Sequence, residues 1–319
     1  MKTSTKSAIL KRRAYIKHWL QKLHSSSSSS SNECKRFLGR GSFGSVYFVR
    51  RKPSTTTAGF PKEMAVKTAK VADAWTLKLE KQVLSKLTAS PYVIRCYGDG
   101  ETIEKEGDDI YYNSDGNGDQ KIYNLFLEFC SGGSLYDHIK KSENGLLACQ
   151  VKSFTRDIVR GLVYIHSEGI VHCDIKPDNI LLVPAGGNDH HDGGGFVAKL
   201  ADFGLAKNML LEDEESPSMR GSSRYMAPEL VKDKCLTFTA DIWALGCVVV
   251  EMMSGEPAWG RGLSKDELFN LIGYSSKVPE IPDNVSEDAK DFLSKCFIRC
   301  EFFRWSAQEL IRHPFLSEW

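Results

Sequence analysis

The sequence predicts an α+β protein with a smaller, mainly β first part and a larger, mainly α second part. Apolar alternation on both sides of a glycine cluster at 37–49 predicts two antiparallel strands, and 64–67 and 123–130 have the apolar character of further strands. Ser131-Gly132-Gly133 breaks the last of these strands, as a hinge between two lobes would. Helical apolar spacing then runs through 149–168, which predicts an amphipathic helix in the second part.

The composition is that of an ordinary soluble globular protein. The 319 residues have a formal net charge of +1, which predicts no overall attraction to nucleic acid or to membranes. The longest apolar run, 244–250, is far too short to cross a bilayer, so no transmembrane segment is expected. The nine cysteines form no C-x-x-C pair, and the N-terminus lacks a secretory apolar core. We therefore expect reduced cysteines and a location in the cytoplasm or the nucleus.

The first 32 residues differ from the rest of the chain. Residues 1–24 contain seven lysines and arginines and no acidic residue, and their apolar residues recur at near-helical spacing. The serine run 25–31 is typical of a flexible linker, so residues 1–32 are expected to be a disordered tail before a folded domain at 33–317. An acidic membrane surface, a calmodulin-like partner and nuclear import all fit the basic tail, as does a solvated tail without a ligand.

The stretch 171–179 contains the polar residues on which the functional prediction rests. Asp174, Lys176 and Asn179 lie within six positions between two apolar segments, and Pro177 forbids a regular helix there. A constrained loop of this kind can direct Asp174 and Asn179 at one point. Phosphoryl transfer needs a carboxylate to orient a hydroxyl, a cation beside the moving phosphoryl group, and an oxygen ligand for Mg²⁺.

Two further motifs suit the same chemistry. The glycines of 39–44 allow backbone amides to approach a triphosphate closely. A dinucleotide site would need a helix after these glycines, whereas the apolar alternation predicts a strand. Asp202 ends an apolar strand, and its spacing from Asn179 permits two oxygen ligands on one Mg²⁺.

Taken in order, these motifs resemble the eukaryotic protein kinase family from about Phe37 to Phe315. The motifs occur in the same order as in that family, namely the glycine-rich turn, the 171–179 loop, Asp202-Phe203-Gly204 and Ala227-Pro228-Glu229. Lys176 with Pro177 resembles the serine/threonine kinases. The segments 278–282, 289–297 and 304–307 are similar to those of plant MEKK-like mitogen-activated protein kinase kinase kinases.

The resemblance implies a two-lobed protein kinase fold, with a mainly β N-lobe at 33–130 and a mainly α C-lobe at 131–317. It implies ATP and Mg²⁺ as cofactors and mitogen-activated protein kinase kinases as protein substrates. Asp174 and Lys176 would act in catalysis, as would Lys67 held by Glu80, while Asn179 and Asp202 would bind the metal. The residues that would bind ATP are Leu38, Gly39, Arg40, Gly41, Ser42, Phe43, Gly44, Val46, Ala65, Lys67, Glu128, Cys130 and Leu181.

The resemblance also implies contacts within the second part and shows one departure. Ser222 would touch both Asp174 and Lys176, and Arg304 would pair with Glu229. Cys173 stands where most kinases have an arginine that binds an activation-loop phosphate, so we expect activity to depend less on that phosphate. A pseudokinase scaffold and a serine/threonine kinase of another subgroup are the alternatives, and the first would predict loss of a catalytic residue.

Overall fold

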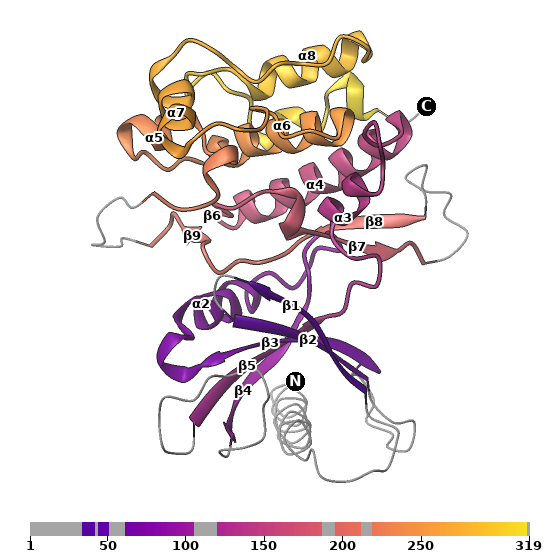
Figure 1. The fold of residues 1–319 in the computed structure, drawn as a ribbon, viewed down its shortest axis with the longest axis vertical. Helices are drawn as coiled ribbons and strands as arrows, with labels where there is room; N and C mark the ends of the chain where they lie inside the picture. The colour runs from indigo at the N-terminus through magenta and orange to yellow at the C-terminus, as the bar shows by residue number, and fades with distance from the viewer. Residues whose placement is uncertain are drawn as a thin grey trace, which may run out of the picture. The chain divides into compact units, whose positions relative to one another are not determined.

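The computed structural model describes residues 34–41, 44–50, 61–104, 120–186, 195–211 and 219–317. These form two compact units. The first unit comprises the chain up to Lys86 together with Arg95–Phe129, and the second comprises Leu87–Ile94 and the chain from Cys130 onwards. The predicted tail, and Ser42 and Phe43 of the predicted ATP site, lie outside the described residues. The α+β prediction is confirmed, because the first unit is mainly sheet and the second mainly helical (Figure 1).

The first unit is built on an antiparallel sheet with the strand order β1-β2-β3-β5-β4. Val66 and Leu125, on two of its inner strands, are fully buried, as the apolar strand patterns predicted. Helix α2 buries Leu77 and Val83, which lie on its apolar side. The elements are β1 (Cys34–Gly41), β2 (Gly44–Arg50), β3 (Glu63–Lys70), η1 (Val71–Asp73), α2 (Trp75–Leu84), β4 (Cys96–Glu104) and β5 (Gln120–Glu128).

The second unit consists of helices and two small two-stranded sheets, β6-β9 and β7-β8. Its helices are α3 (Leu135–Lys140), α4 (Ala148–Ser167), α5 (Pro228–Asp233), α6 (Phe238–Ser254), α7 (Lys265–Phe269), α8 (Glu287–Cys296) and α9 (Ala307–Leu310). Its strands are β6 (Ile170–Val171), β7 (Ile180–Pro184), β8 (Phe196–Leu200) and β9 (Lys207–Asn208). Short turns of helix lie at η2 (Pro177–Asn179), η3 (Ser223–Tyr225), η4 (Asn270–Tyr274) and η5 (Pro314–Leu316).

Helix α6 forms the centre of the second unit. It is apolar on nearly every side, which is typical of a helix surrounded by protein, and Trp243 and Leu245 are fully buried. Gly255 ends it in the left-handed conformation, with φ 74°. Helix α4 packs against α6 and β8 and buries one apolar face, as its periodicity predicted. No helix within the described ranges is long and apolar enough to cross a membrane.

Candidate active site

The loop between β6 and β7 is held by one carboxylate from helix α6. Asp241, which is 2% exposed, accepts hydrogen bonds from the backbone nitrogens of His172 (2.8 Å) and Cys173 (3.0 Å). Its Oδ2 also lies 2.9 Å from Nε2 of His166 in α4. Two helices of the buried core therefore fix the backbone from which Asp174 projects. The sequence prediction gave Asp241 no role in this site.

The structure brings Asp174, Lys176, Asn179 and Ser222 together. The Asp174 carboxylate accepts hydrogen bonds from Asn179 Nδ2 (2.9 Å) and from the backbone nitrogen of Ser222 (2.8 Å). Lys176 Nζ lies 2.9 Å from Asp174 Oδ2 and donates to Ser222 Oγ at 2.9 Å. Ser222 thus touches both residues, as the resemblance implied. Asp174 is buried, so its carboxylate is oriented by protein groups rather than by bulk water.

Asp202 follows β8 in a conformation that is uncommon for a non-glycine residue, with φ 62°. The residues on both sides of it are fixed. The backbone nitrogen of Ala201 donates to the carbonyl oxygen of Asn179 (2.9 Å), and the fully buried Phe203 packs on His172 with ring centroids 4.7 Å apart. The segment that carries Asp202 is therefore attached to the loop that carries Asn179.

The side-chain oxygen atoms of Asn179 and Asp202 are suitable ligands for Mg²⁺. Asn179 Nδ2 donates to both the carbonyl and the carboxylate of Asp174, which directs the amide oxygen of Asn179 away from Asp174. That amide oxygen and the Asp202 carboxylate are the hard oxygen ligands that Mg²⁺ prefers, and Mg²⁺ commonly uses one or two carboxylates together with substrate phosphates. Among the described residues, no three His, Cys, Asp or Glu side chains form a metal site that the protein completes alone.

The first unit places Lys67 and Glu80 as a paired cation and anion. Lys67 Nζ, on β3, lies 2.8 Å and 3.0 Å from the two carboxylate oxygens of Glu80, on α2. Glu80 is 1% exposed, whereas the Lys67 side chain is 19% exposed. The buried carboxylate holds the ammonium group of a lysine whose side chain remains partly exposed, which suits a lysine that contacts a phosphate.

The predicted glycine-rich turn joins β1 and β2 in antiparallel register, with Gly39 opposite Val46 and Gly41 opposite Gly44. A Cβ atom at Gly39 would meet nothing within 4 Å, so the backbone there is open to a close approach. At Gly44 the φ of 150° and the nearby Thr68 carbonyl both require glycine.

The other residues predicted to bind ATP have different surroundings. In the first unit Leu38 and Arg40 are exposed, whereas Ala65 is partly buried on β3 and pairs with Leu127 of β5. Glu128 ends β5, and its backbone nitrogen donates to the carbonyl of Arg95 (2.9 Å). In the second unit Cys130 is buried and Leu181 lies partly buried on β7.

Cys173, the departure from the usual arginine, is partly buried. Its φ is 69°, and its thiol lies 3.5 Å from the carbonyl oxygen of Val171. Burial, followed by the negative charge of Asp241, raises the pKa of this thiol well above its ordinary value, so it stays neutral at physiological pH. The Arg220 guanidinium opposes that shift, which means that a cation from the following segment lies within electrostatic reach of Cys173.

The segment after Arg220 is fastened to the loop and to α6. The backbone of Gly221 lies against the carbonyl of Cys173, Tyr225 Oη donates to Glu251 Oε2 at 2.7 Å, and an Arg224 guanidinium nitrogen donates to the carbonyl of Gly260. Burial raises the pKa of Glu251 above its ordinary value. These contacts hold residues 221–226 without an arginine at position 173.

Gly221→Ala is expected to reduce activity about a hundredfold, because small displacements at an active site have costs of this order. The added Cβ would clash with the Cys173 carbonyl, and the φ of 101° disfavours any side chain. Initial phosphorylation rates measure the effect. Gly262→Ala is the matched control, since Gly262 has a φ of 86° but nothing within 4 Å of its Cβ position. Equal rates for both variants would show that the Gly221–Cys173 contact is unimportant.

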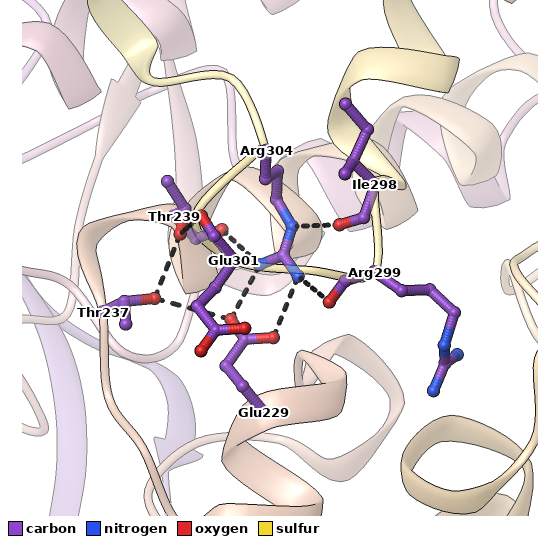
Figure 2. A network of polar contacts seen from close by, with 7 residues as sticks. All are labelled: Glu229, Thr237, Thr239, Ile298, Arg299, Glu301 and Arg304. Carbon is purple, nitrogen blue, oxygen red and sulfur yellow. Dashed lines mark hydrogen bonds and ion pairs between the residues drawn. The ribbon is translucent and has the colours of Figure 1, made fainter.

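A buried ion pair joins α5 to the loop between α8 and α9. Arg304 lies 2.7 Å and 2.9 Å from the two carboxylate oxygens of Glu229, and both side chains are at most 2% exposed. Figure 2 shows that the guanidinium also donates to the carbonyls of Thr239, Ile298 and Arg299. The pair implied by the kinase resemblance is present, and it secures α5, which follows residues 221–226.

Comparison with known proteins decides the family. A protein-family model described as the protein kinase domain matches residues 32–316. The chain belongs to the protein kinase family. Mitogen-activated protein kinase kinase kinase 20 of Arabidopsis thaliana is 40% identical over 286 residues, which cover 88% of this chain and 76% of the relative. Kinase kinase kinases 17 and 18 of the same plant are 38% and 37% identical over 88% of this chain, and the matches cover 68% and 75% of their lengths.

The family assignment identifies the fold to which the two structural units belong. The mainly β first unit and the mainly helical second unit confirm the predicted two-lobed kinase fold. The predicted resemblance to plant mitogen-activated protein kinase kinase kinases is likewise confirmed. As a member of this kinase group, the chain is an ATP-dependent protein serine/threonine kinase.

Proposed function

We propose that this kinase phosphorylates serine or threonine residues of mitogen-activated protein kinase kinases, and so acts as a mitogen-activated protein kinase kinase kinase. The hydrogen-bonded set of Asp174, Lys176, Asn179 and Ser222 supports the chemistry. Identities of 37–40% to three kinases of that name, over 88% of the chain, support the substrate class.

In the second unit, Asp174 orients the hydroxyl of the substrate and accepts its proton, while Lys176 steadies the transferred phosphoryl group. The contacts of both side chains with Ser222 keep them oriented before substrate arrives. Asn179 and Asp202 supply oxygen ligands for Mg²⁺. Bound ATP supplies the phosphoryl group, and its Mg²⁺ neutralises charge on the phosphate oxygens.

In the first unit, Lys67 binds the α- and β-phosphates, and Glu80 keeps its ammonium group in place. The glycines at 39, 41 and 44 let backbone amides approach the phosphates. The apolar groups proposed to contact adenine are Val46 and Ala65, together with Leu181 of the second unit, while the backbone around Glu128 and Cys130 provides its hydrogen-bonding partners.

Two further expectations concern the cellular location of the enzyme and the binding partner of its basic tail. The cysteines whose surroundings are described are free thiols, which supports a reducing compartment such as the cytoplasm or the nucleus. The charge of residues 1–24 supports binding of the tail to an acidic surface or partner. No observation favours a pseudokinase or another serine/threonine subgroup.

The test is phosphorylation of a panel of purified kinase kinases by the parent enzyme and by Lys67→Met. We expect selective phosphorylation of one or a few panel members, and a loss of about 10²- to 10³-fold in rate for Lys67→Met, because a preorganised cation is removed from the phosphates. Lys70→Met is the matched control, since Lys70 ends the same strand but is exposed.

Two results would contradict the proposal. An active enzyme that phosphorylates a generic protein but no kinase kinase would refute the substrate class. A Lys67→Met protein as active as Lys70→Met would refute the phosphate-binding role of Lys67.

A further inference from the structure

Two adjacent phenylalanines of the second unit are almost fully exposed. Phe302 is 84% exposed and Phe303 is 75% exposed, in a turn at residues 300–304 between α8 and α9. Among the described residues, no large apolar side chain is more exposed than these two. Because a phenylalanine can bury roughly 200 Å², the two together expose about 300 Å² of contiguous, mainly apolar surface. An exposed apolar patch of this size on a protein surface is often a functional one.

Hydrogen bonds on both sides of these residues fix the backbone of the 300–304 turn. The backbone nitrogens of Phe303 and Arg304 both donate to the carbonyl oxygen of Cys300, each at 3.1 Å. Thr239 Oγ1, from α6, donates to the carbonyl oxygen of Glu301 at 3.2 Å. The buried Arg304 guanidinium also donates to two backbone carbonyls just before the turn (Figure 2). A partner that binds the two rings therefore meets a preorganised backbone, which lowers the entropy lost on binding.

The turn is connected by direct contacts to the segment beside Asp174. Arg304 lies 2.7 Å and 2.9 Å from the two carboxylate oxygens of Glu229, on α5. Helix α5 follows residues 221–226, and within that segment the backbone nitrogen of Ser222 donates to the Asp174 carboxylate at 2.8 Å. A protein that brings a hydroxyl to Asp174 and also contacts the turn would therefore bind one continuous part of the second unit.

The size and charge of the turn favour a globular protein as the partner. A symmetric contact between two copies of the turn would bury about 600 Å² from the rings, about half of the roughly 1,200 Å² that a stable interface needs. An anionic bilayer would require cations around the rings. The two arginines of 299–305, Arg299 and Arg304, donate to backbone carbonyls, and the remaining charged residue is the acidic Glu301. An apolar pocket on another protein suits the two rings better.

We propose that Phe302 and Phe303 form a docking anchor for the substrate kinase kinase, and that the two rings enter an apolar pocket on that protein. The pocket lies apart from the serine or threonine that is phosphorylated. Once the anchor is bound, the hydroxyl is presented to Asp174 at a raised local concentration. The inference rests on the proposed function, because it takes the kinase kinase as the substrate. It distinguishes the whole substrate protein from a short peptide, which can reach Asp174 but has no pocket for the rings.

The test compares the parent enzyme with the double variant Phe302→Ser, Phe303→Ser on two substrates. One is a kinase-inactive form of a whole kinase kinase that the parent phosphorylates, and the other is a short peptide that copies its phosphorylated segment. For the whole protein we expect KM to rise at least about tenfold with little change in kcat, because aromatic anchors commonly contribute this much or more to binding. For the peptide, both kcat and KM should stay at the parental values, which also shows that the variant is folded.

Leu147→Ser is the matched control, since Leu147 is 69% exposed on the same unit, directly before α4. It should match the parent on both substrates. The docking anchor is refuted if the double variant has the same KM for the whole protein as this control, or if it loses activity on the peptide to the same extent. Either result would leave the proposed substrate class intact. A parent enzyme that phosphorylates a generic protein but no kinase kinase would instead refute the substrate class, and the anchor with it.

Discussion

Asp174→Asn protein is expected to keep its fold while its rate of phosphoryl transfer falls by roughly 10²- to 10⁴-fold, the usual contribution of a positioned general base. Asparagine has nearly the same shape, and its side-chain oxygen can still accept the hydrogen bond from the Ser222 backbone nitrogen. It removes the negative charge that lies 2.9 Å from Lys176 and that would receive the proton of the substrate hydroxyl. Single-turnover rates with saturating ATP measure this step directly.

The matched control for this prediction is Asp178→Asn. Asp178 lies four residues away in the same loop but is exposed, so the substitution makes the same chemical change at the protein surface. Its single-turnover rate should remain close to that of the parent. Circular dichroism and a thermal melt establish that both variants are folded. If Asp174→Asn were as fast as Asp178→Asn, Asp174 would not be the catalytic carboxylate.

Local pattern was sufficient to predict most of the elements. The predicted helix at 149–168 corresponds to α4 (Ala148–Ser167), because a long amphipathic period is a strong signal. The predicted strand at 123–130 corresponds to β5 (Gln120–Glu128) and is displaced by up to three residues. Its ends are set by pairing with β3 and β4, which depends on distant residues. Element type is therefore more predictable than element boundary.

The site residues that lie within a sequence motif could be predicted from the sequence. The residues that hold them in place could not, because they are distant in the sequence. Asp241 fixes the catalytic loop from a position 68 residues after Cys173, and nothing local to Asp241 indicates that contact. The contact between Gly221 and the Cys173 carbonyl had one signal in the sequence, which is the glycine itself, directly before Ser222. Cys173 and Asp202 adopt positive φ although neither is glycine, because tertiary contacts outweigh local preference.

Arg304→Ala is expected to lower the free energy of unfolding by about 3–5 kcal/mol, the usual result of removing one partner from a buried pair. The variant would leave the Glu229 carboxylate buried without its counter-ion, and three carbonyl oxygens would lose a charged donor. Glu229→Gln keeps most of the hydrogen-bonding geometry and should have a smaller effect. Chemical denaturation followed by tryptophan fluorescence reports on this region, because the Arg304 guanidinium lies 5.2 Å from the ring of Trp243.

The same chain offers an exposed ion pair as the control. Arg261 donates two hydrogen bonds to Glu256, but their side chains are 63% and 56% exposed. Arg261→Ala should therefore change the free energy of unfolding by at most about 1 kcal/mol, since water and salt screen such pairs. The two arginines make similar contacts with a carboxylate, so the difference between their variants isolates the effect of burial. If Arg304→Ala were no more destabilising than Arg261→Ala, the Glu229–Arg304 pair would not be what secures α5.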